Sequence, residues 1–198
     1  MLTQLQRYTP EEYLQNEEQA DYKSEYHSGE IIPMTGGTTN HNELALNLAA
    51  ALKISLKGQG CKVYIGDVHL WIPRYQRFTY PDVMVVQGQP RYYGSSSTTV
   101  TNPHLIAEIL SQSTQNYDQG DKFTAYRSIP DLQEYLMIDQ TQYRLMHYVK
   151  TDAGSWTLTE TEVTATGVDT ASLTLATIAF TLPFSDLYAG VDFSQPDQ

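Results

Sequence analysis

The chain has 198 residues, 40% of them hydrophobic and 18% charged, which is enough for one globular domain with a sizeable core. Its 12 basic residues are outnumbered by 23 acidic ones, and the formal net charge of −11 counts against a protein that grips nucleic-acid phosphates over a broad surface. One cysteine excludes an internal disulfide and a thiolate zinc cluster, and no secretory leader or apolar run of about 18 residues is seen. We therefore expect a soluble, cytoplasmic protein in which a divalent cation could still attract anions to one site.

The first elements are a short helix and a hairpin. Residues 9–14 (TPEEYL) combine an N-cap threonine, a proline at the first helical position and two glutamates in the first turn, all typical of a helix start. Residues 22–34 alternate like two strands around Ser28-Gly29, with Glu25 on the first arm. Pro33 indicates that the second arm lies at a sheet edge.

A long helix and three β-rich runs follow. Apolar residues recur at three- and four-residue steps from 38 to 56, a pattern that predicts an amphipathic helix. Residues 61–73, 80–86 and 104–110 are rich in β-branched and aromatic residues and nearly continuous in apolar character, as in strands covered on both faces.

The remaining pattern adds a short helix and more strands. Residues 118–127 are helical in pattern and end before Ser128-Ile129-Pro130, while 132–139 and 143–149 predict two strands and 155–163 a further edge strand. This order predicts an α/β or α+β fold, a sheet with a helix on each side.

Two acidic residues stand in apolar strands. Glu108 alternates in HLIAEIL (104–110) with Leu105, Ala107 and Ile109 on the other face, and Asp82 opens the run YPDVMVV. An ionised carboxylate buried there costs several kcal/mol unless it is paired or binds a metal. Two such acids on adjacent strands would form an oxygen site suited to Mg²⁺.

Lys122 is the candidate cation. On the predicted helix 118–127 it shares one face with Tyr126, and this helix follows the Glu108 strand after the short segment Ser-Gln-Ser-Thr (111–114). Side chains on that face of the helix can reach the end of the strand that carries Glu108. A lysine near a metal suits phosphodiester hydrolysis, because it offsets the developing charge and orients water.

These residues carry a resemblance. Pro81-Asp82 followed by Glu108-Ile109-Leu110 resembles the PD-(D/E)xK nuclease superfamily. More specifically, the chain resembles the Uma family of bacterial restriction-endonuclease-like proteins over about residues 8–150. The segments that carry this likeness are TPEEYL, EYHSGEI, YPDVMVV, AEILSQST, DQGDKFTAY and IPDLQEYLMID.

The resemblance implies a restriction-endonuclease-like core: a mixed central sheet flanked by helices, with an N-terminal hairpin. We expect residues 1–198 to form one such domain, with a core over about 8–150 and a C-terminal extension over 151–198. Leu110 occupies the position where the superfamily motif has its lysine, and the family likeness implies that Lys122 replaces that lysine from the helix.

The resemblance also implies a site and an activity. Asp82 and Glu108 are expected as metal ligands, Lys122 as the charge-stabilising or water-positioning residue, and Glu25 as a further acid completing the metal shell. The cofactor would be Mg²⁺, with Mn²⁺ able to substitute. The implied function is a metal-dependent endonuclease that hydrolyses DNA phosphodiester bonds by attack of a metal-activated water, working as a homodimer.

Two other functions stay open. A non-catalytic interaction module could retain the fold, as the acidic balance favours, or a hydrolase of small phosphate esters could use the same site without a basic groove. The spatial arrangement of the basic residues bears on this choice. Those residues are Lys23, Lys53, Lys57, Lys62, Arg74, Arg77 and Arg91.

Structural explanations also exist for each candidate residue. Asp82 could cap a turn, Glu108 could form a purely structural ion pair with Lys122, and Glu25 could simply be exposed. Alone, Lys122 would more often be a solvated helix residue. His41, near the start of the long helix, could contact phosphate, but a surface role is favoured.

Overall fold

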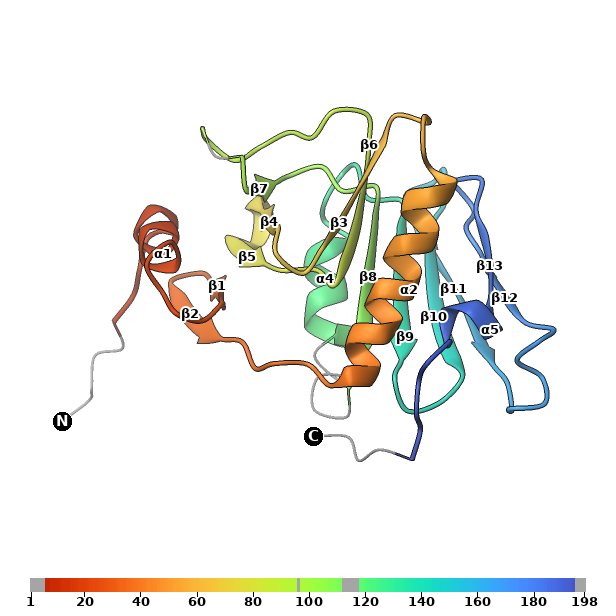
Figure 1. The fold of residues 1–198 in the computed structure, drawn as a ribbon. Helices are drawn as coiled ribbons and strands as arrows, with labels where there is room; N and C mark the ends of the chain where they lie inside the picture. The colour runs from red at the N-terminus through yellow and green to blue at the C-terminus, as the bar shows by residue number, and fades with distance from the viewer. Residues whose placement is uncertain (1–5, 96, 112–117, 195–198) are drawn as a thin grey trace.

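A computed structural model describes residues 6–95, 97–111 and 118–194, so that of the segment 111–114 only Ser111 lies within the described part. Two sheets form the framework (Figure 1). The six-stranded sheet has the order β11 (Trp156–Glu162), β10 (Arg144–Lys150), β9 (Glu134–Asp139), β8 (Leu105–Leu110), β6 (Val83–Gln87), β3 (Cys61–Ile65). The five-stranded sheet has the order β2 (Glu30–Pro33), β1 (Ser24–His27), β5 (Arg77–Thr79), β4 (His69–Ile72), β7 (Thr99–Val100).

The six-stranded sheet is mixed, which confirms the predicted architecture. Strands β8 and β9 run parallel, and the helical segment after β8 makes the crossover that a parallel pair requires. The other neighbouring pairs of this sheet are antiparallel. All six residues of β8 are buried, as its nearly continuous apolar pattern predicted, and all six residues of β9 are buried as well.

The N-terminal hairpin is also confirmed. Strands β1 and β2 pair around Ser28 and Gly29, both of which have positive φ, and β2 ends at Pro33 on the edge of its sheet. The expectation of one β-rich run over 61–73 was wrong. Gly66, with φ +37°, turns the chain there, so that β3 and β4 belong to different sheets.

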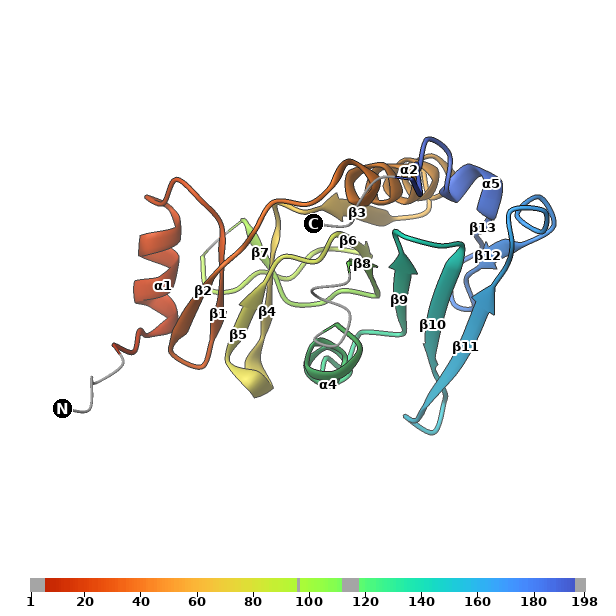
Figure 2. The same ribbon diagram turned by 90° about the horizontal axis from the view of Figure 1, so that it is seen from below.

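Helices lie on both faces of the six-stranded sheet. Helix α2 (Thr39–Ser55) begins at the N-cap Thr38, whose hydroxyl accepts from the His41 amide, and buries Leu44, Leu48 and Leu52. On the opposite face, a π-helical turn (Asp118–Lys122) continues into α4 (Phe123–Tyr126), as Figure 2 shows. The predicted short helix therefore forms, but its first turn is not α-helical.

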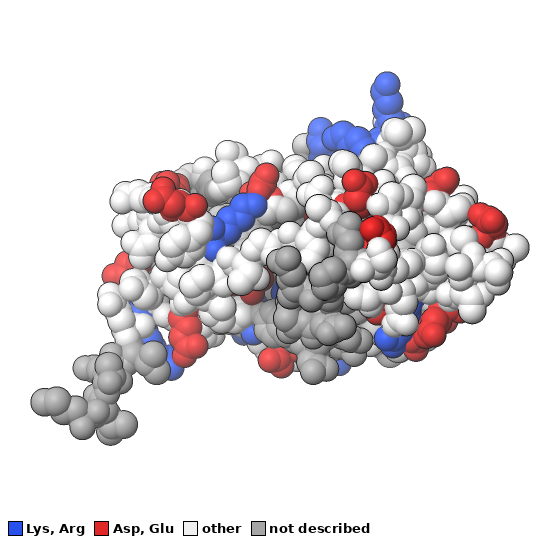
Figure 3. All heavy atoms as spheres, turned by 60° about the horizontal axis from the view of Figure 1, so that its bottom comes forward, with Lys and Arg blue, Asp and Glu red and all other residues white. Residues whose placement is uncertain are grey.

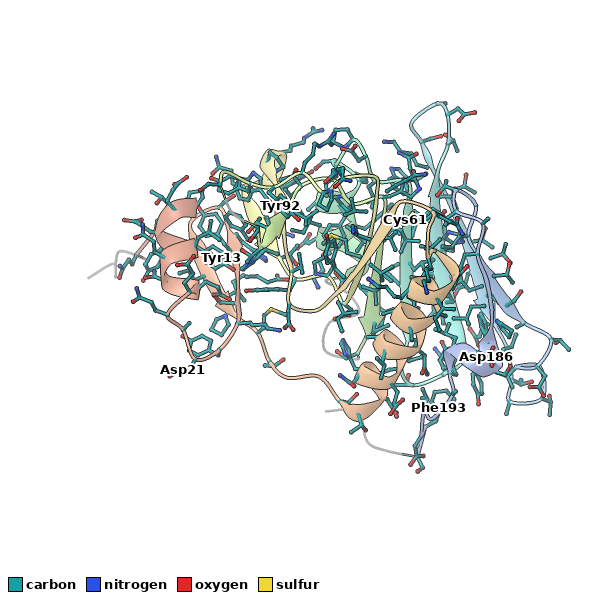
Figure 4. All side chains as sticks on the ribbon, turned by 45° about the horizontal axis from the view of Figure 1, so that its top comes forward. Tyr13, Asp21, Cys61, Tyr92, Asp186 and Phe193 are labelled. Atoms are coloured by element: carbon teal, nitrogen blue, oxygen red, sulfur yellow. The ribbon has the colours of Figure 1, made fainter. Side chains whose placement is uncertain are left out.

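The first helix packs through aromatic rings. Helix α1 (Pro10–Glu17) has the predicted Thr9 cap, reinforced by Glu12 in a capping box. Its one buried residue, Tyr13, labelled in Figure 4, stacks on Phe78 of β5 with ring centroids 5.2 Å apart and also contacts Tyr26 of β1. This cluster fastens α1 to the five-stranded sheet.

The C-terminal segment shares the core of the six-stranded sheet. Strands β12 (Ser172–Thr174) and β13 (Thr181–Pro183) pair, and α5 (Phe184–Leu187) follows. Leu173, Phe184 and Leu187 pack in one cluster with the buried face of α2. Among the described residues, no helix has the length and apolar character needed to cross a membrane.

Candidate active site

The sheet register brings the two predicted acids together. Val83 of β6 lies opposite Ala107 of β8 in an antiparallel pair. Asp82 comes one residue before β6 and therefore lies opposite Glu108. Residues directly opposite in an antiparallel pair place their side chains on the same face of the sheet. Both carboxylates line one pocket of about 640 Å³.

Asp82 is fastened through one of its oxygens. Oδ2 accepts the backbone amide of Ile109 at 2.8 Å and lies 3.1 Å from His41 Nε2. Burial tends to raise the pKa of Asp82, but the His41 hydrogen bond, the nearby positive charges and the Ile109 amide lower it overall. Asp82 is therefore ionised in a half-buried position. Its contacts link the start of β6 to β8 and to α2, which is more than the turn-capping role that a lone Pro-Asp suggests.

Glu108 is buried, with 2% of its surface exposed. Its Oε1 accepts the hydroxyl of Tyr126 at 2.5 Å, and its Oε2 lies 3.3 Å from Lys122 Nζ. Tyr126 is itself fully buried, and burial together with the neighbouring Glu108 and Glu25 charges raises the pKa of its phenol, which stays a donor. The structural ion pair between Glu108 and Lys122 that the sequence left open is therefore present.

Lys122 points inward. Its side chain is 11% exposed, and its Nζ lies between Glu108 Oε2 and Glu25 Oε1, the latter at 3.9 Å. The solvated-helix interpretation of Lys122 is therefore wrong. The amine lines the same pocket as Asp82 and Glu108.

Glu25 is also buried, although the hairpin position made exposure the default expectation. Oε1 accepts the Thr79 hydroxyl at 2.5 Å, and Oε2 lies 2.9 Å from His27 Nε2. Burial alone would raise the pKa of Glu25, but His27, Lys122 and Thr79 together lower it to about 2. Both carboxylate oxygens of Glu25 thus have partners from the protein.

The donor set suits a hard cation. Across residues 6–95, 97–111 and 118–194, no three His, Cys, Asp or Glu side chains are grouped as a metal site. Mg²⁺, however, needs only one or two protein carboxylates, because water fills its remaining positions. Asp82 and Glu108 could provide that number of oxygen ligands, whereas zinc sites are built mainly from histidine and cysteine.

The sequence did not assign several residues that line the pocket or hold its carboxylates. His41 reaches Asp82, whereas a surface role was favoured, and Tyr126 appeared only as a neighbour of Lys122 on the helix face. Thr79 and Gln140 were not singled out, yet Thr79 binds Glu25 and Gln140 accepts the hydroxyl of Thr38. No local pattern marks either residue, since both come from strand ends brought together by the fold.

The basic residues do not gather at the pocket. Lys23 lines it but is paired with Asp67. Lys53 lies twelve residues along α2 from His41, roughly 18 Å at the helical rise, and Lys62 pairs with Val86 toward the far end of β6. Figure 3, which turns the bottom of Figure 1 forward, shows acidic and basic side chains interspersed on that face.

Comparison with known proteins agrees with this architecture. The family described as "Uma2: Putative restriction endonuclease" matches residues 10–185. Two uncharacterized proteins of Synechocystis sp. are similar in sequence. The protein sll1609 is 47% identical over 152 residues, covering 77% of this chain and 86% of its own. The protein slr1290 is 39% identical over 148 residues, covering 75% of this chain and 77% of its own.

A solved structure shares the fold. It is described as a putative nuclease belonging to DUF820 from Anabaena variabilis, and it superposes with a TM-score of 0.70 over 92% of this chain and 98% of its own. Sequence identity is 16%, so this likeness concerns the fold alone.

Proposed function

We propose, since this chain belongs to the Uma2 family, that its pocket hydrolyses phosphodiester bonds of DNA with the aid of Mg²⁺ or Mn²⁺. The observation that carries the proposal is the charge balance. Three carboxylates, those of Glu25, Asp82 and Glu108, line the pocket with the Lys122 ammonium, while the second lysine there, Lys23, is paired with Asp67. The acidic excess is formally two charges, and a divalent cation would offset both.

Asp82 and Glu108 are the proposed ligands. The oxygen of Asp82 that is not bonded to His41 and Ile109, Oδ1, makes no hydrogen bond within the described residues. Bound there, the cation would neutralise phosphate charge and lower the pKa of water. Glu25 was expected in the metal shell. Both of its oxygens have close partners, Thr79 at 2.5 Å and His27 at 2.9 Å, whereas the second contact of Glu108, from Lys122, is longer at 3.3 Å, so we assign Glu25 instead to keeping Lys122 in place.

Lys122 has the proposed role of charge stabilisation. Its amine lies inside the pocket and is held by Glu108 and Glu25, so it need not reorganise when negative charge grows on the phosphoryl oxygens. In a partly water-excluded pocket such a donor is worth more than in bulk water. Loss of one such donor typically lowers the rate by about 100- to 1,000-fold.

A plasmid assay tests the proposal. Wild type should nick or linearise supercoiled plasmid in MnCl₂ or MgCl₂ and do nothing in EDTA, and Asp82→Asn and Glu108→Gln should each abolish cleavage. Asp186→Asn is the matched control, because Asp186 is an exposed acid on α5 outside the pocket lining. Cleavage that survives Asp82→Asn and Glu108→Gln would refute the assignment. Light scattering on the same samples tests the expected homodimer.

A second candidate is a hydrolase of small phosphate esters. The scatter of the basic residues favours it, because duplex DNA needs phosphate contacts well beyond one pocket. Bis(4-nitrophenyl) phosphate and the plasmid therefore belong in the same experiment. Turnover of the small diester by wild type but not Glu108→Gln, with intact plasmid, would support the second candidate over the first.

A further inference from the structure

Each proposed ligand has one oxygen that accepts a hydrogen bond from a neighbouring backbone amide or tyrosine hydroxyl of the protein. Asp82 is fastened by Oδ2 alone, through His41 and the Ile109 amide. Glu108 is fastened by Oε1, which accepts the Tyr126 hydroxyl at 2.5 Å, while its Oε2 makes a longer contact of 3.3 Å with Lys122 Nζ in the pocket. In each carboxylate one oxygen is thus fixed by protein donors, which determines the direction of the other.

The histidine contact has a defined polarity. Asp82 Oδ2 accepts the Ile109 amide at 2.8 Å, and an ionised carboxylate offers only acceptors to its neighbours. His41 Nε2 must therefore carry the proton and donate it to Oδ2 over 3.1 Å. The other ring nitrogen, Nδ1, then faces the chain segment before α2.

Gly37 makes room for this histidine. A Cβ added at Gly37 would stand 3.1 Å from His41 Cγ and 2.9 Å from Nδ1, the latter closer than real Cβ atoms approach. At Gly36 an added Cβ would meet nothing within 4 Å. The two adjacent glycines therefore differ: only Gly37 is required for the His41 ring to lie where it reaches Asp82.

The tyrosine contact is equally constrained. The Tyr126 side chain is fully buried, and its hydroxyl lies 2.5 Å from Glu108 Oε1 and 3.4 Å from Thr79 Oγ1. Thr79 in turn donates to Glu25. This chain of hydrogen bonds links β8, α4 and the hairpin, so Glu108 cannot rotate without breaking it.

We propose that His41 and Tyr126 are positioning residues, which fix one oxygen of Asp82 and of Glu108 so that the other oxygen of each is directed at a divalent cation. The inference rests on the proposed function, because it assumes that these two carboxylates bind the metal. Partners of metal-binding groups typically change metal affinity by about 10- to 100-fold. We expect a loss of about tenfold for each residue.

Calorimetric titration with Mn²⁺ alone, without substrate, is the primary test. His41→Ala should weaken binding about tenfold, whereas His41→Gln, whose amide can donate from a similar position, should recover most of the affinity. His104→Ala is the control, because His104 bonds Thr177 and is absent from the pocket lining. Equal Mn²⁺ affinity of wild type and His41→Ala would overturn the role of His41.

The glycine pair tests the same contact without removing the histidine. Gly37→Ala should weaken Mn²⁺ binding and Gly36→Ala should not. In a His41→Ala background the Gly37→Ala change should have no further effect, because the added methyl then has no ring to displace. An equal effect of Gly37→Ala with and without His41 would show that it acts elsewhere.

Tyr126→Phe should also weaken Mn²⁺ binding. The matched control is Tyr188→Phe, which removes a buried hydroxyl that donates to the Arg144 carbonyl at 2.8 Å, away from the pocket. Circular dichroism confirms folding of each variant. Equal affinities of Tyr126→Phe and Tyr188→Phe would overturn the role of Tyr126.

The outcomes separate the two proposals. If wild type binds Mn²⁺ and Glu108→Gln does not, the metal site stands and the variants above decide on positioning. If wild type binds no Mn²⁺, the metal-dependent function fails and the positioning roles fail with it.

Discussion

Replacing Lys122 by methionine removes the cation that lies between two buried carboxylates. The Nζ atom is 3.3 Å from Glu108 Oε2 and 3.9 Å from Glu25 Oε1. At an effective dielectric constant of about 20, these separations correspond to attractions of about 5 and about 4 kcal/mol. Methionine avoids the cost of burying the ammonium, which is several kcal/mol, so the net loss in unfolding free energy should be about 3 to 5 kcal/mol.

The loss should depend on pH. In wild type the pKa of Glu25 falls from 4.5 to about 2, and although burial opposes this shift, Lys122 is among the groups that cause it. A lowered pKa stabilises the fold fully above about pH 4.5, and this contribution disappears as the pH falls toward 2. Lys122→Met loses part of this contribution. The difference in unfolding free energy between wild type and variant should therefore be largest at pH 7 and decrease below pH 4.5.

Urea unfolding in EDTA at pH 7 and pH 4 measures both effects. Lys53→Met is the control, because Lys53 is exposed on α2 outside the pocket lining. A loss of about 3 kcal/mol should lower Tm by roughly 6 to 12 °C in a protein of this size. Addition of Mg²⁺ should restore part of the stability, about 2.7 kcal/mol at 100 times Kd.

A loss below about 1 kcal/mol at pH 7 in EDTA would contradict this electrostatic account. It would mean that the carboxylates are neutral or that water screens them, as at an exposed ion pair. A loss equal at pH 7 and pH 4 would indicate lost packing of the lysine stem instead of lost charge.

Three further predictions concern the rest of the fold. Burial lowers the pKa of His69 from 6.5 to about 4, so wild-type stability should fall by up to about 3 kcal/mol between pH 6.5 and 4, and His69→Phe should flatten that slope in urea unfolding. Thr38→Ala removes the N-cap of α2 and the bond to Gln140, and should cost about 2 kcal/mol by the same measurement. Fully buried Glu134 accepts the amides of Ala176 and Thr177, so Glu134→Ala should cost about 3 kcal/mol and speed hydrogen exchange at those two amides more than at the β9 amides.

Elements whose signals are local could be predicted from the sequence alone. The Thr9 cap marks the first helix start correctly, because an N-cap depends on a few neighbouring residues. The alternation of side chains along the strand 104–110 was also informative, because it predicted that Glu108 is buried. A carboxylate in a strand buried on both faces must find a partner, so the sequence could predict that Asp82, Glu108 and Lys122 approach one another.

The contacts that hold these groups depend on long-range packing and could not be predicted from the sequence. The Asp82–His41 contact joins residues 41 apart, and the bond between Tyr126 and Glu108 depends on how α4 crosses the sheet. The division of 61–73 between two sheets likewise follows from pairing with distant strands. Local propensity carries no information on such pairing, because the free energy that selects a register comes from side chains that meet only after the chain has folded.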